Sequence, residues 1–472
     1  MKPALFCFKI ISLTLLFMGL MLYGFTGNSQ EEIASGSAGV YSEVRVGITL
    51  QDSHVDLSFE NNYRLIDRNR ESILDISPGR YSFYKENEGI KIVDRQGEAQ
   101  GIFKGPLLLQ PVSSPASKYS FRLHNAPKGS EYRGNLEIIG DNRNITVVNI
   151  LDIEYYLKGV VPCEMPTSWG NYGGMEALKA QAVAARTYAL YNQLKRDKGH
   201  IHVCDTEYTQ VYRGKAAETP NTDKAIEETK GELLYYNGSL VQPYYYATSG
   251  GYTERSENVW NSSLPYLNSV HDPYDDPDNP LGISNMIIHP HARWKTELPA
   301  SSITGLLKQH IHPSFGSVKQ VKVASTFESG RVEELLIEGD GGNIALFKDE
   351  ARTALGLRSQ LFTVKEELKE QVWVAYSVNG SPRKENLSGL DGKWVINGNG
   401  TKEMVTGSSL NALNGNGSVS HIPRKAFIFE GKGWGHGVGM SQNGAYNRAR
   451  EGYSYQEILS FYYPGTSLTK SR

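Results

Sequence analysis

Short segments in which apolar and polar residues alternate fill the chain from residue 41 to about residue 125. Residues 44–48, 81–84 and 90–93 are examples, and turn residues separate them. Alternation with a period of two is typical of half-buried strands. The pattern therefore predicts a small β-rich module at 41–125, in which we find no chemical motif.

A hairpin and a long helix follow this module. Residues 132–139 and 145–150 have the alternation of paired strands, whereas residues 175–195 are rich in Ala, Leu, Lys and Gln, which favour helices. Small apolar residues recur in this helix at helical spacing, at Leu178, Ala182, Ala185 and Ala189. Such a face lets another backbone approach closely. The elements together predict an α+β fold that is rich in strands and has a few helices.

The N-terminus carries an apolar run of a different kind. Residues 10–25 are apolar, small or hydroxyl-bearing, and Lys2 and Lys9 precede them. A run of this length is typical of an export signal or a short membrane anchor. We therefore expect a signal or anchor at 1–26 and a polar linker at 27–40, with the rest of the chain outside the cytoplasm because the lysines stay inside.

Composition narrows the range of partners. The chain has 49 Lys and Arg against 51 Asp and Glu, so it lacks the basic excess that marks a nucleic-acid-binding protein. Residues 365–425 are rich in Gly, Asn and Ser and carry no motif, which indicates a variable insertion of hairpins and loops. We expect neither nucleic acid nor a disulfide framework, since only Cys163 and Cys204 follow the leader. The sequence leaves open whether these two cysteines form a single disulfide bond.

One carboxylate stands out in the sequence. Glu164 lies between Pro162 and Pro166, just before the alanine-rich helix. Proline fixes φ and biases the preceding residue away from the helical region, so we expect Glu164 in stiff extended or turn backbone. This would suit a group that must be aimed at a substrate. A lone Glu in a loop is more commonly solvated or caps a helix, and spacing alone favours that alternative.

Alternating glycines form a second pattern. Gly431, Gly433, Gly435, Gly437 and Gly439 occupy every other position. In an extended chain one face would then be bare backbone, open to another backbone or to a glycan. His436 would point to the other face, where it either orients Glu164, binds substrate or is a structural imidazole. Ser441 is expected to cap a short helix, and Ser454 and Glu457 form a capping box.

Three ordered blocks resemble the SpoIID/LytB family. The first comprises residues 156–166 and 176–189, the second 210–214 and 246–254, and the third 433–445. Together they span most of the chain from about residue 132 to 464, in the family's order. The resemblance implies a SpoIID/LytB-like catalytic domain at 126–472 that folds around a glycan-binding cleft.

The resemblance also implies a reaction. Glu164 would be the single general acid and base of a peptidoglycan lytic transglycosylase, which cleaves the MurNAc–GlcNAc β-1,4 bond and leaves 1,6-anhydro-MurNAc ends, in engulfment during sporulation. Ordinary glycosidases need two carboxylates, and we find no second one at the centre of a motif. Such an acid needs a raised pKa, and burial against Val161, Met165 and Trp169 would raise it.

The family implies an alternative as well. In the amidase-enhancer branch the protein is not an enzyme but binds the cell wall and acts with an amidase or another wall hydrolase. Members of the sporulation branch keep the N-terminal anchor, so we expect attachment to the cell membrane, or secretion if the leader is cleaved. Peptidoglycan glycan strands are the expected partner in both branches.

Eight residues of the matching blocks are expected to bind substrate: Gln181, Arg186, Tyr188, Ser249, Gly250, His436, Ser441 and Gln442. Gln181 and Arg186 lie on the predicted helix and would reach back toward Glu164. For Arg186 a structural ion pair is an equally good interpretation. Ser249 would be an exposed donor next to flexible glycines.

A metal site has weaker support. His200, His202 and Cys204 alternate, and related proteins hold zinc near this position. However, the His-Cys pair of those relatives is replaced here by Tyr208-Thr209, and a closed zinc site needs about four ligands. We therefore expect no cofactor. The acidic loop at 275–278 lacks a calcium-binding pattern, so a solvated turn is the preferred interpretation.

Overall fold

The computed structural model describes residues 43–470 apart from short gaps. The gaps are 69–71, 88, 127–130, 142, 197–200, 261, 280, 369–371, 379–380, 388–393, 397–401, 405–408, 414–418 and 424. The fold is strand-rich α+β, as predicted. The predicted leader at 1–26 and linker at 27–40 lie outside the described residues. No helix within the described part of the chain has the length and apolar character needed to span a membrane.

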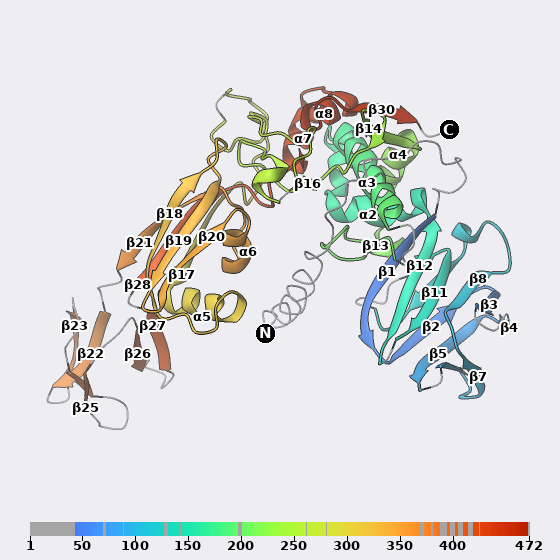
Figure 1. The fold of residues 1–472 in the computed structure, drawn as a ribbon, viewed down its shortest axis with the longest axis horizontal. Helices are drawn as coiled ribbons and strands as arrows, with labels where there is room; N and C mark the ends of the chain where they lie inside the picture. Colours follow the sequence, from blue (N-terminus) through green and yellow to red (C-terminus); the bar gives the residue numbers. More distant parts are fainter. Residues whose placement is uncertain are drawn as a thin grey trace. The chain divides into compact units, whose positions relative to one another are not determined.

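The described residues form two compact units (Figure 1). The larger unit comprises 43–255, 263–289 and 437–470, and the smaller unit comprises 256–262 and 290–436. Each unit is thus built from separate stretches of the chain. Residues 437–470 return to the unit that contains the N-terminal strands, so the glycine-rich block near the C-terminus is split between the two.

Two antiparallel sheets occupy the N-terminal part of the larger unit. The first sheet has the order β13-β1-β12-β11-β8-β3-β4 and the second β10-β9-β2-β5-β6-β7. Their strands are β1 (Glu43–Asp52), β2 (His54–Phe59), β3 (Tyr63–Asp67), β4 (Ser72–Ile76), β5 (Gly79–Glu86), β6 (Gly89–Asp94), β7 (Ala99–Phe103), β8 (Leu107–Pro111), β9 (Ser120–Leu123), β10 (Glu131–Arg133), β11 (Asn135–Gly140), β12 (Ile145–Asp152) and β13 (Val203–Cys204). Within the first sheet only β13 runs parallel to its neighbour, β1. Because β1 pairs with β12 and β8 pairs with β11, the sheet crosses the predicted boundary at residue 125.

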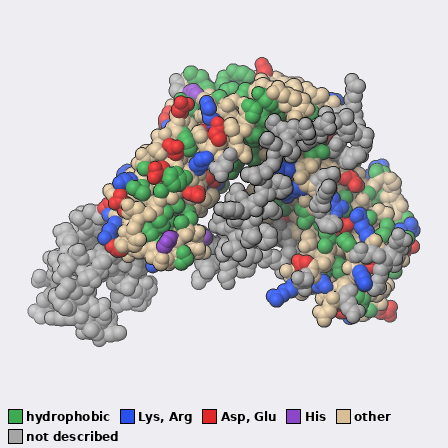
Figure 2. Space-filling view, in the orientation of Figure 1, with side chains coloured by type: hydrophobic (Ala, Val, Ile, Leu, Met, Phe, Trp, Pro, Cys, Tyr) green, Lys and Arg blue, Asp and Glu red, His purple; other side chains and the backbone are tan. Residues whose placement is uncertain are grey.

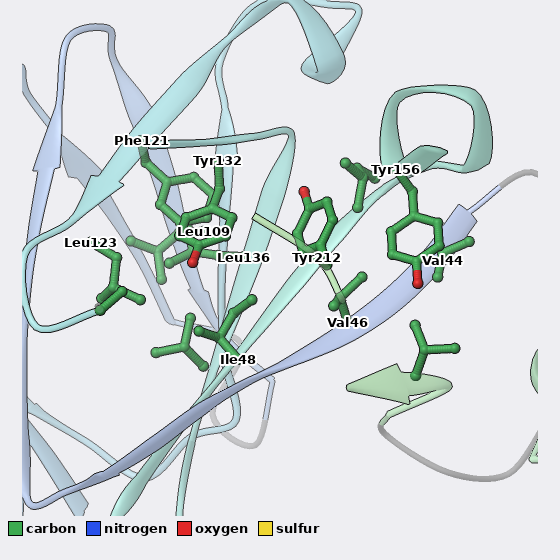
Figure 3. Close-up of a cluster of buried hydrophobic side chains, with 14 of the residues drawn as sticks. Val44, Val46, Ile48, Leu109, Phe121, Leu123, Tyr132, Leu136, Tyr156 and Tyr212 are labelled. Carbon is green, nitrogen blue, oxygen red and sulfur yellow. The ribbon is translucent and has the colours of Figure 1, made fainter. Parts of the chain in front are cut away.

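One buried hydrophobic cluster takes side chains from both sheets. Figure 3 shows side chains of β1, β8, β9 and β11 pointing toward one another. On β1, Val44, Val46 and Ile48 are buried, so the alternation in the sequence marks the face that packs inward. The rings of Tyr156 and Tyr212 lie in the same cluster, 5.1 Å apart.

The helices of the larger unit gather around α3. They are α2 (Ile153–Glu164), α3 (Met175–Lys195), α4 (Pro220–Glu228), α7 (Gln442–Arg450) and α8 (Tyr455–Tyr462). The bounds of α3 confirm the predicted helix, and it contacts all four others (Figure 1). The small residues of α3 let the other helices pack close to it. The predicted caps are also confirmed, because Ser441 caps α7 and Ser454 forms a capping box with Glu457.

Short elements complete the larger unit. Its 3-10 helices are η1 (Ala116–Lys118), η2 (Thr167–Asn171) and η3 (Gly214–Ala217). A small sheet contains β15 (Ser239–Leu240), β14 (Glu232–Tyr236) and β30 (Ser467–Lys470), and β16 (Tyr245–Tyr246) pairs in parallel with β29 (Met440–Ser441). The pair β16–β29 joins the second and third blocks of the sequence motif. It brings the start of α7 next to the chain around residue 246.

The backbone at Glu164 differs from the prediction. Glu164 is the last residue of α2, and Pro162 lies inside that helix. The expectation of extended backbone was wrong because Val160 and Val161 are fully buried, and their packing carries the helix through the proline. Only Met165, which precedes Pro166, is extended, with φ −127° and ψ 144°.

The alternating glycines do not form a strand with a bare face. Strand β28 ends at Lys432, and the glycines that follow, from Gly433 to Gly439, have φ between 78° and 113°. These conformations favour glycine. At Gly439 a Cβ would also lie 2.1 Å from the carbonyl oxygen of Tyr244. The prediction of an extended ladder was therefore wrong, and close backbone packing explains Gly439.

The described part of the smaller unit contains two three-stranded sheets, two α-helices and one 3-10 helix. They are β17 (Arg293–Pro299), β28 (Lys425–Lys432) and β21 (Phe362–Leu368), then β18 (Val318–Thr326), β19 (Val332–Gly339) and β20 (Gly342–Phe347), with η4 (Ser256–Asn258), α5 (Ala300–His310) and α6 (Glu350–Leu355). Within the predicted insertion at 365–425 the described residues form hairpins β22 (Val372–Val378) with β23 (Ser381–Leu387), β24 (Trp394–Ile396) with β25 (Lys402–Met404), and β26 (Ser409–Leu413) with β27 (Val419–Pro423).

Candidate functional site

The carboxylate of Glu164 lies where three distant segments of the larger unit meet. Its Oε1 accepts a hydrogen bond from the backbone N–H of Val211 at 3.3 Å. Its Oε2 accepts one from the side-chain amide of Gln442, the first residue of α7, at 3.5 Å. Both donors are neutral, so neither brings a counter-charge to the carboxylate.

The amide of Gln442 also contacts α3. Its Nε2 donates to Oε1 of Gln181 at 3.5 Å. Gln181 is fully buried, and its own Nε2 has no hydrogen-bond partner among the described residues. A buried amide donor without an acceptor costs about 1–3 kcal/mol. This buried donor lies on the residue that bonds Gln442, one amide away from Glu164.

The surroundings of Glu164 make it a weak acid. Burial raises its pKa to about 7, although hydrogen bonds from Val211 and Gln442 oppose the rise, and the charge of exposed Glu207 adds to it. The side chain is still partly exposed. A carboxyl with this pKa is about half protonated at neutral pH, so it can both give and take a proton there.

This raised pKa predicts a change of stability with pH. Between pH 4.5 and about 7 the folded state holds the proton of Glu164 more tightly than the unfolded chain does, so the contribution of Glu164 to stability falls as pH rises. Glu164→Gln removes this loss. We expect its free energy of unfolding, relative to wild type, to rise by about 3 kcal/mol between pH 4.5 and pH 8 in urea titrations. A difference that stays constant with pH would contradict a raised pKa.

A network of side chains supports the Val211 contact. Gln210 is buried, and its amide accepts from the hydroxyl of Tyr156 at 3.0 Å and donates to the hydroxyl of Tyr245 at 2.9 Å. It also donates to the carbonyl of Ala185 on α3. Gln210 thus anchors the segment that presents the N–H of Val211. Sequence reasoning missed Val211 as a site residue, because a backbone donor leaves no mark in the sequence.

The acidic loop is a second centre of hydrogen bonds in the larger unit. Asp275 is buried and accepts from Thr248, Ser249, Ser441 and Asn443. The prediction of a solvated turn was therefore wrong. Ser249 is also fully buried, and its hydroxyl accepts from Gly251, so its expected role as an exposed donor was wrong too. Gly250, with φ 72°, lies in the same buried turn.

Comparison with known proteins identifies the family. A family model described as Stage II sporulation protein matches residues 141–236, and a second, a domain of unknown function (DUF8618), matches 254–381. An uncharacterised protein of Brachyspira hyodysenteriae is 32% identical over 345 residues, which are 72% of this chain and 73% of that protein. The chain belongs to the SpoIID family.

Two named relatives are similar to this SpoIID-family chain. The amidase enhancer of Bacillus subtilis is 36% identical over 324 residues, which are 66% of this chain. The chain spans only 40% of the length of that relative. Stage II sporulation protein D of Bacillus subtilis is 27% identical over 344 residues, which are 70% of this chain and 77% of that protein.

In this SpoIID-family protein, Arg186 bonds residues other than Glu164. It is fully buried and donates to both oxygens of Glu154, at 2.9 and 2.7 Å, and to the carbonyls of Ile226 and Glu232. The expected reach toward Glu164 was therefore wrong, and the alternative of a structural ion pair describes these contacts. Tyr188 packs edge-on against the ring of Tyr244, with centroids 6.0 Å apart.

His436 belongs to the smaller unit, whereas Glu164 belongs to the larger one. The imidazole packs against Trp260, with ring centroids 5.0 Å apart. Its orientation of Glu164 or of a substrate stays a prediction. Of the eight predicted substrate-binding residues, Gln442 bonds Glu164, Gln181 bonds Gln442, and Ser441 is the cap of α7 directly before Gln442.

The candidate zinc residues are only partly described. His200 lies outside the described residues, and no group of three His, Cys, Asp or Glu side chains that could hold a metal occurs within them. The Nδ1 of His202 accepts from the backbone of Arg45, and the Cys204 thiol contacts two threonines.

The two described cysteines do not form the bridge that the sequence left open. Both Cys163 and Cys204 are free. The thiol of Cys163 donates to the carbonyl of Gly159, and burial raises its pKa to about 11. Because the thiolate is the reactive form, Cys163 is a poor nucleophile at neutral pH.

Charges are mixed over the visible surface of both units. On the face that Figure 2 shows, Lys and Arg side chains lie among Asp and Glu side chains. This mixture matches the near balance of the whole chain, with 49 basic and 51 acidic residues.

Proposed function

We propose that this cell-wall protein of the SpoIID family is a peptidoglycan lytic transglycosylase, with Glu164 as its single acid and base. The observation that carries the proposal is a partly exposed carboxyl with a pKa of about 7, held by two neutral donors. The similarity to Stage II sporulation protein D supports it.

In the first step protonated Glu164 gives its proton to the oxygen of the MurNAc–GlcNAc bond. The bond between this oxygen and C1 of MurNAc breaks, and GlcNAc leaves with a hydroxyl. The N–H of Val211 and the amide of Gln442 stabilise the carboxylate that remains. These donors keep the base in position for the next transfer.

In the second step the Glu164 carboxylate takes the proton from the C6 hydroxyl of MurNAc. The C6 oxygen attacks C1, which closes the 1,6-anhydro ring and restores protonated Glu164. No water is consumed, so the reaction needs no second carboxylate to activate one.

A second candidate function rests on the similarity to the amidase enhancer of Bacillus subtilis. In this alternative, Gln181, Gln442 and Glu164 bind glycan without cleaving it, and the protein acts with an amidase. In both cases the leader pattern at 1–26 would direct the body outside the cytoplasm, and a role in engulfment belongs to the first.

The products of the reaction distinguish the two functions. Purified protein is mixed with glycan strands stripped of stem peptides, and the fragments are analysed by mass spectrometry. We expect fragments that end in 1,6-anhydro-MurNAc. Ordinary reducing ends would indicate hydrolysis. Intact glycan, together with wall binding and stimulation of an added amidase, would support the enhancer instead.

A further inference from the structure

The buried carboxylate of Asp275 accepts four hydrogen bonds from the start of α7 and from the turn at Thr248 and Ser249. Its Oδ1 accepts from Thr248 at 2.9 Å and from Asn443 at 2.8 Å. Its Oδ2 accepts from the hydroxyl of Ser441 at 2.5 Å and from the backbone N–H of Ser249. A carboxylate offers about four acceptor positions, so these donors use all of them.

Two of these donors flank Gln442. Ser441 also caps α7 by accepting from the N–H of Gly444 at 3.1 Å. Asn443 also donates to the carbonyl of Ile287 at 3.1 Å, and its backbone N–H bonds to Ala247. The residues on either side of Gln442 are therefore fixed, and they fix the point from which its side chain starts.

The hydrogen bond between Gln442 and Glu164 depends closely on the position of the start of α7. The amide of Gln442 lies 3.5 Å from both Glu164 and Gln181, at the long end of the range for a hydrogen bond. A displacement of a few tenths of an ångström at the start of α7 would break either contact. Asp275 limits that displacement through Ser441 and Asn443, in addition to the bonds of Asn443 to Ile287 and Ala247.

We propose that Asp275 is a positioning residue, which acts through Ser441 and Asn443 to keep the amide of Gln442 on the carboxyl of Glu164. The chemistry favours an aspartate here, since all four partners donate. An asparagine would turn its own N–H₂ toward two of the donors and release them. The effect of Asp275 on turnover rests on the proposed function, whereas its effect on Glu164 does not.

Several groups besides Gln442 affect the pKa of Glu164, and a change at Asp275 leaves them in place. Tyr156, Tyr245 and Cys163 lie near enough to interact electrostatically with it, and Glu207 raises its pKa. The bond from Gln442 lowers that pKa. Loss of this bond therefore raises the pKa of Glu164 further, with the other groups unchanged.

The test is a carboxyl titration of the full-length protein by carbon-13 NMR with labelled glutamate, in which Glu164→Gln assigns the Glu164 signal. We expect Asp275→Asn and Gln442→Leu each to raise the pKa of Glu164 by about 0.5–1 unit. In the double variant the shift should equal that of Gln442→Leu alone, because Asp275 acts through Gln442. Additive shifts, or no shift in Asp275→Asn, would overturn the proposal.

Two further variants keep this test decisive. Asp272→Asn is the matched control, since Asp272 is equally buried in the same loop but bonds Tyr462 and Arg448, in the last turn of α7, rather than the residues beside Gln442. It should lower stability without moving the titration of Glu164. If Asp275→Asn does not fold, Ser441→Ala removes one of its bonds, and the absence of any shift there would refute the idea. The titration needs no turnover, so failure of the proposed reaction leaves it intact.

Discussion

Glu164→Gln lowers the rate at which anhydro ends form by about 10³-fold, the size of effect typical of a general acid and base. Glutamine has nearly the same shape and can still accept from one of the two donors, Val211 or Gln442, while its N–H₂ faces the other, and it can neither give nor take the proton. Binding of glycan should therefore survive. The rate is measured as anhydro-MurNAc ends per folded protein, and binding by co-sedimentation with cell wall.

The pH dependence of this reaction provides the control. The acid form of Glu164 starts the reaction, so kcat/KM should fall about tenfold per pH unit above a pH of about 7. Glu207→Gln removes the charge that raises this pKa, and the fall should then begin at lower pH. An unchanged rate in Glu164→Gln would exclude the mechanism. A fall in Glu207→Gln as large as in Glu164→Gln would give Glu207 a direct role.

Local features of the sequence predict local features of the fold. Helix α3 has the predicted bounds because its good helix formers and small face agree with its surroundings. The caps at Ser441 and Ser454 are likewise found where their patterns place them, since capping involves residues within one turn. The strands around residues 44, 81 and 90 follow from alternation alone.

The two backbone errors have one cause. Glu164, between Pro162 and Pro166, was expected in extended or turn backbone, yet the buried residues before Pro162 keep α2 helical as far as Glu164. The alternating glycines suggested a strand, yet a positive φ and the carbonyl next to Gly439 are what require glycine. In both cases tertiary packing decided between conformations that the local sequence permits.

The site shows the limits of sequence reasoning more clearly. Glu164 and Gln442 are separated by 278 positions, and only the fold brings them together. The motif blocks predicted that Gln181 and Gln442 belong to one site, but not that one amide bonds the other. Ser249 and Arg186 belong to the same blocks and support the structure instead, because a motif residue that holds the fold and one that contacts substrate have the same sequence signature.

Arg186→Met tests this distinction and should reduce the free energy of unfolding by about 3–5 kcal/mol. The guanidinium of Arg186 joins α3 to the first turn of α2 through Glu154, to α4 through the carbonyl of Ile226 and to β14 through Glu232. Without it, the partly buried Glu154 carboxylate loses its opposite charge. Denaturant titration measures the loss.

Two comparisons separate a structural Arg186 from one that binds substrate. In Arg186→Met with Glu154→Gln the unpaired charge is gone, so the double variant should recover much of the stability that the single variant loses. Activity per folded molecule should stay near that of wild type in both variants, since Arg186 contacts Glu154 rather than Glu164. If kcat falls in folded Arg186→Met and the added Glu154→Gln does not restore it, the result would show instead that Arg186 binds substrate. Because α2 carries Glu154 in its first turn and Glu164 as its last residue, this ion pair fixes the far end of the helix that presents the acid.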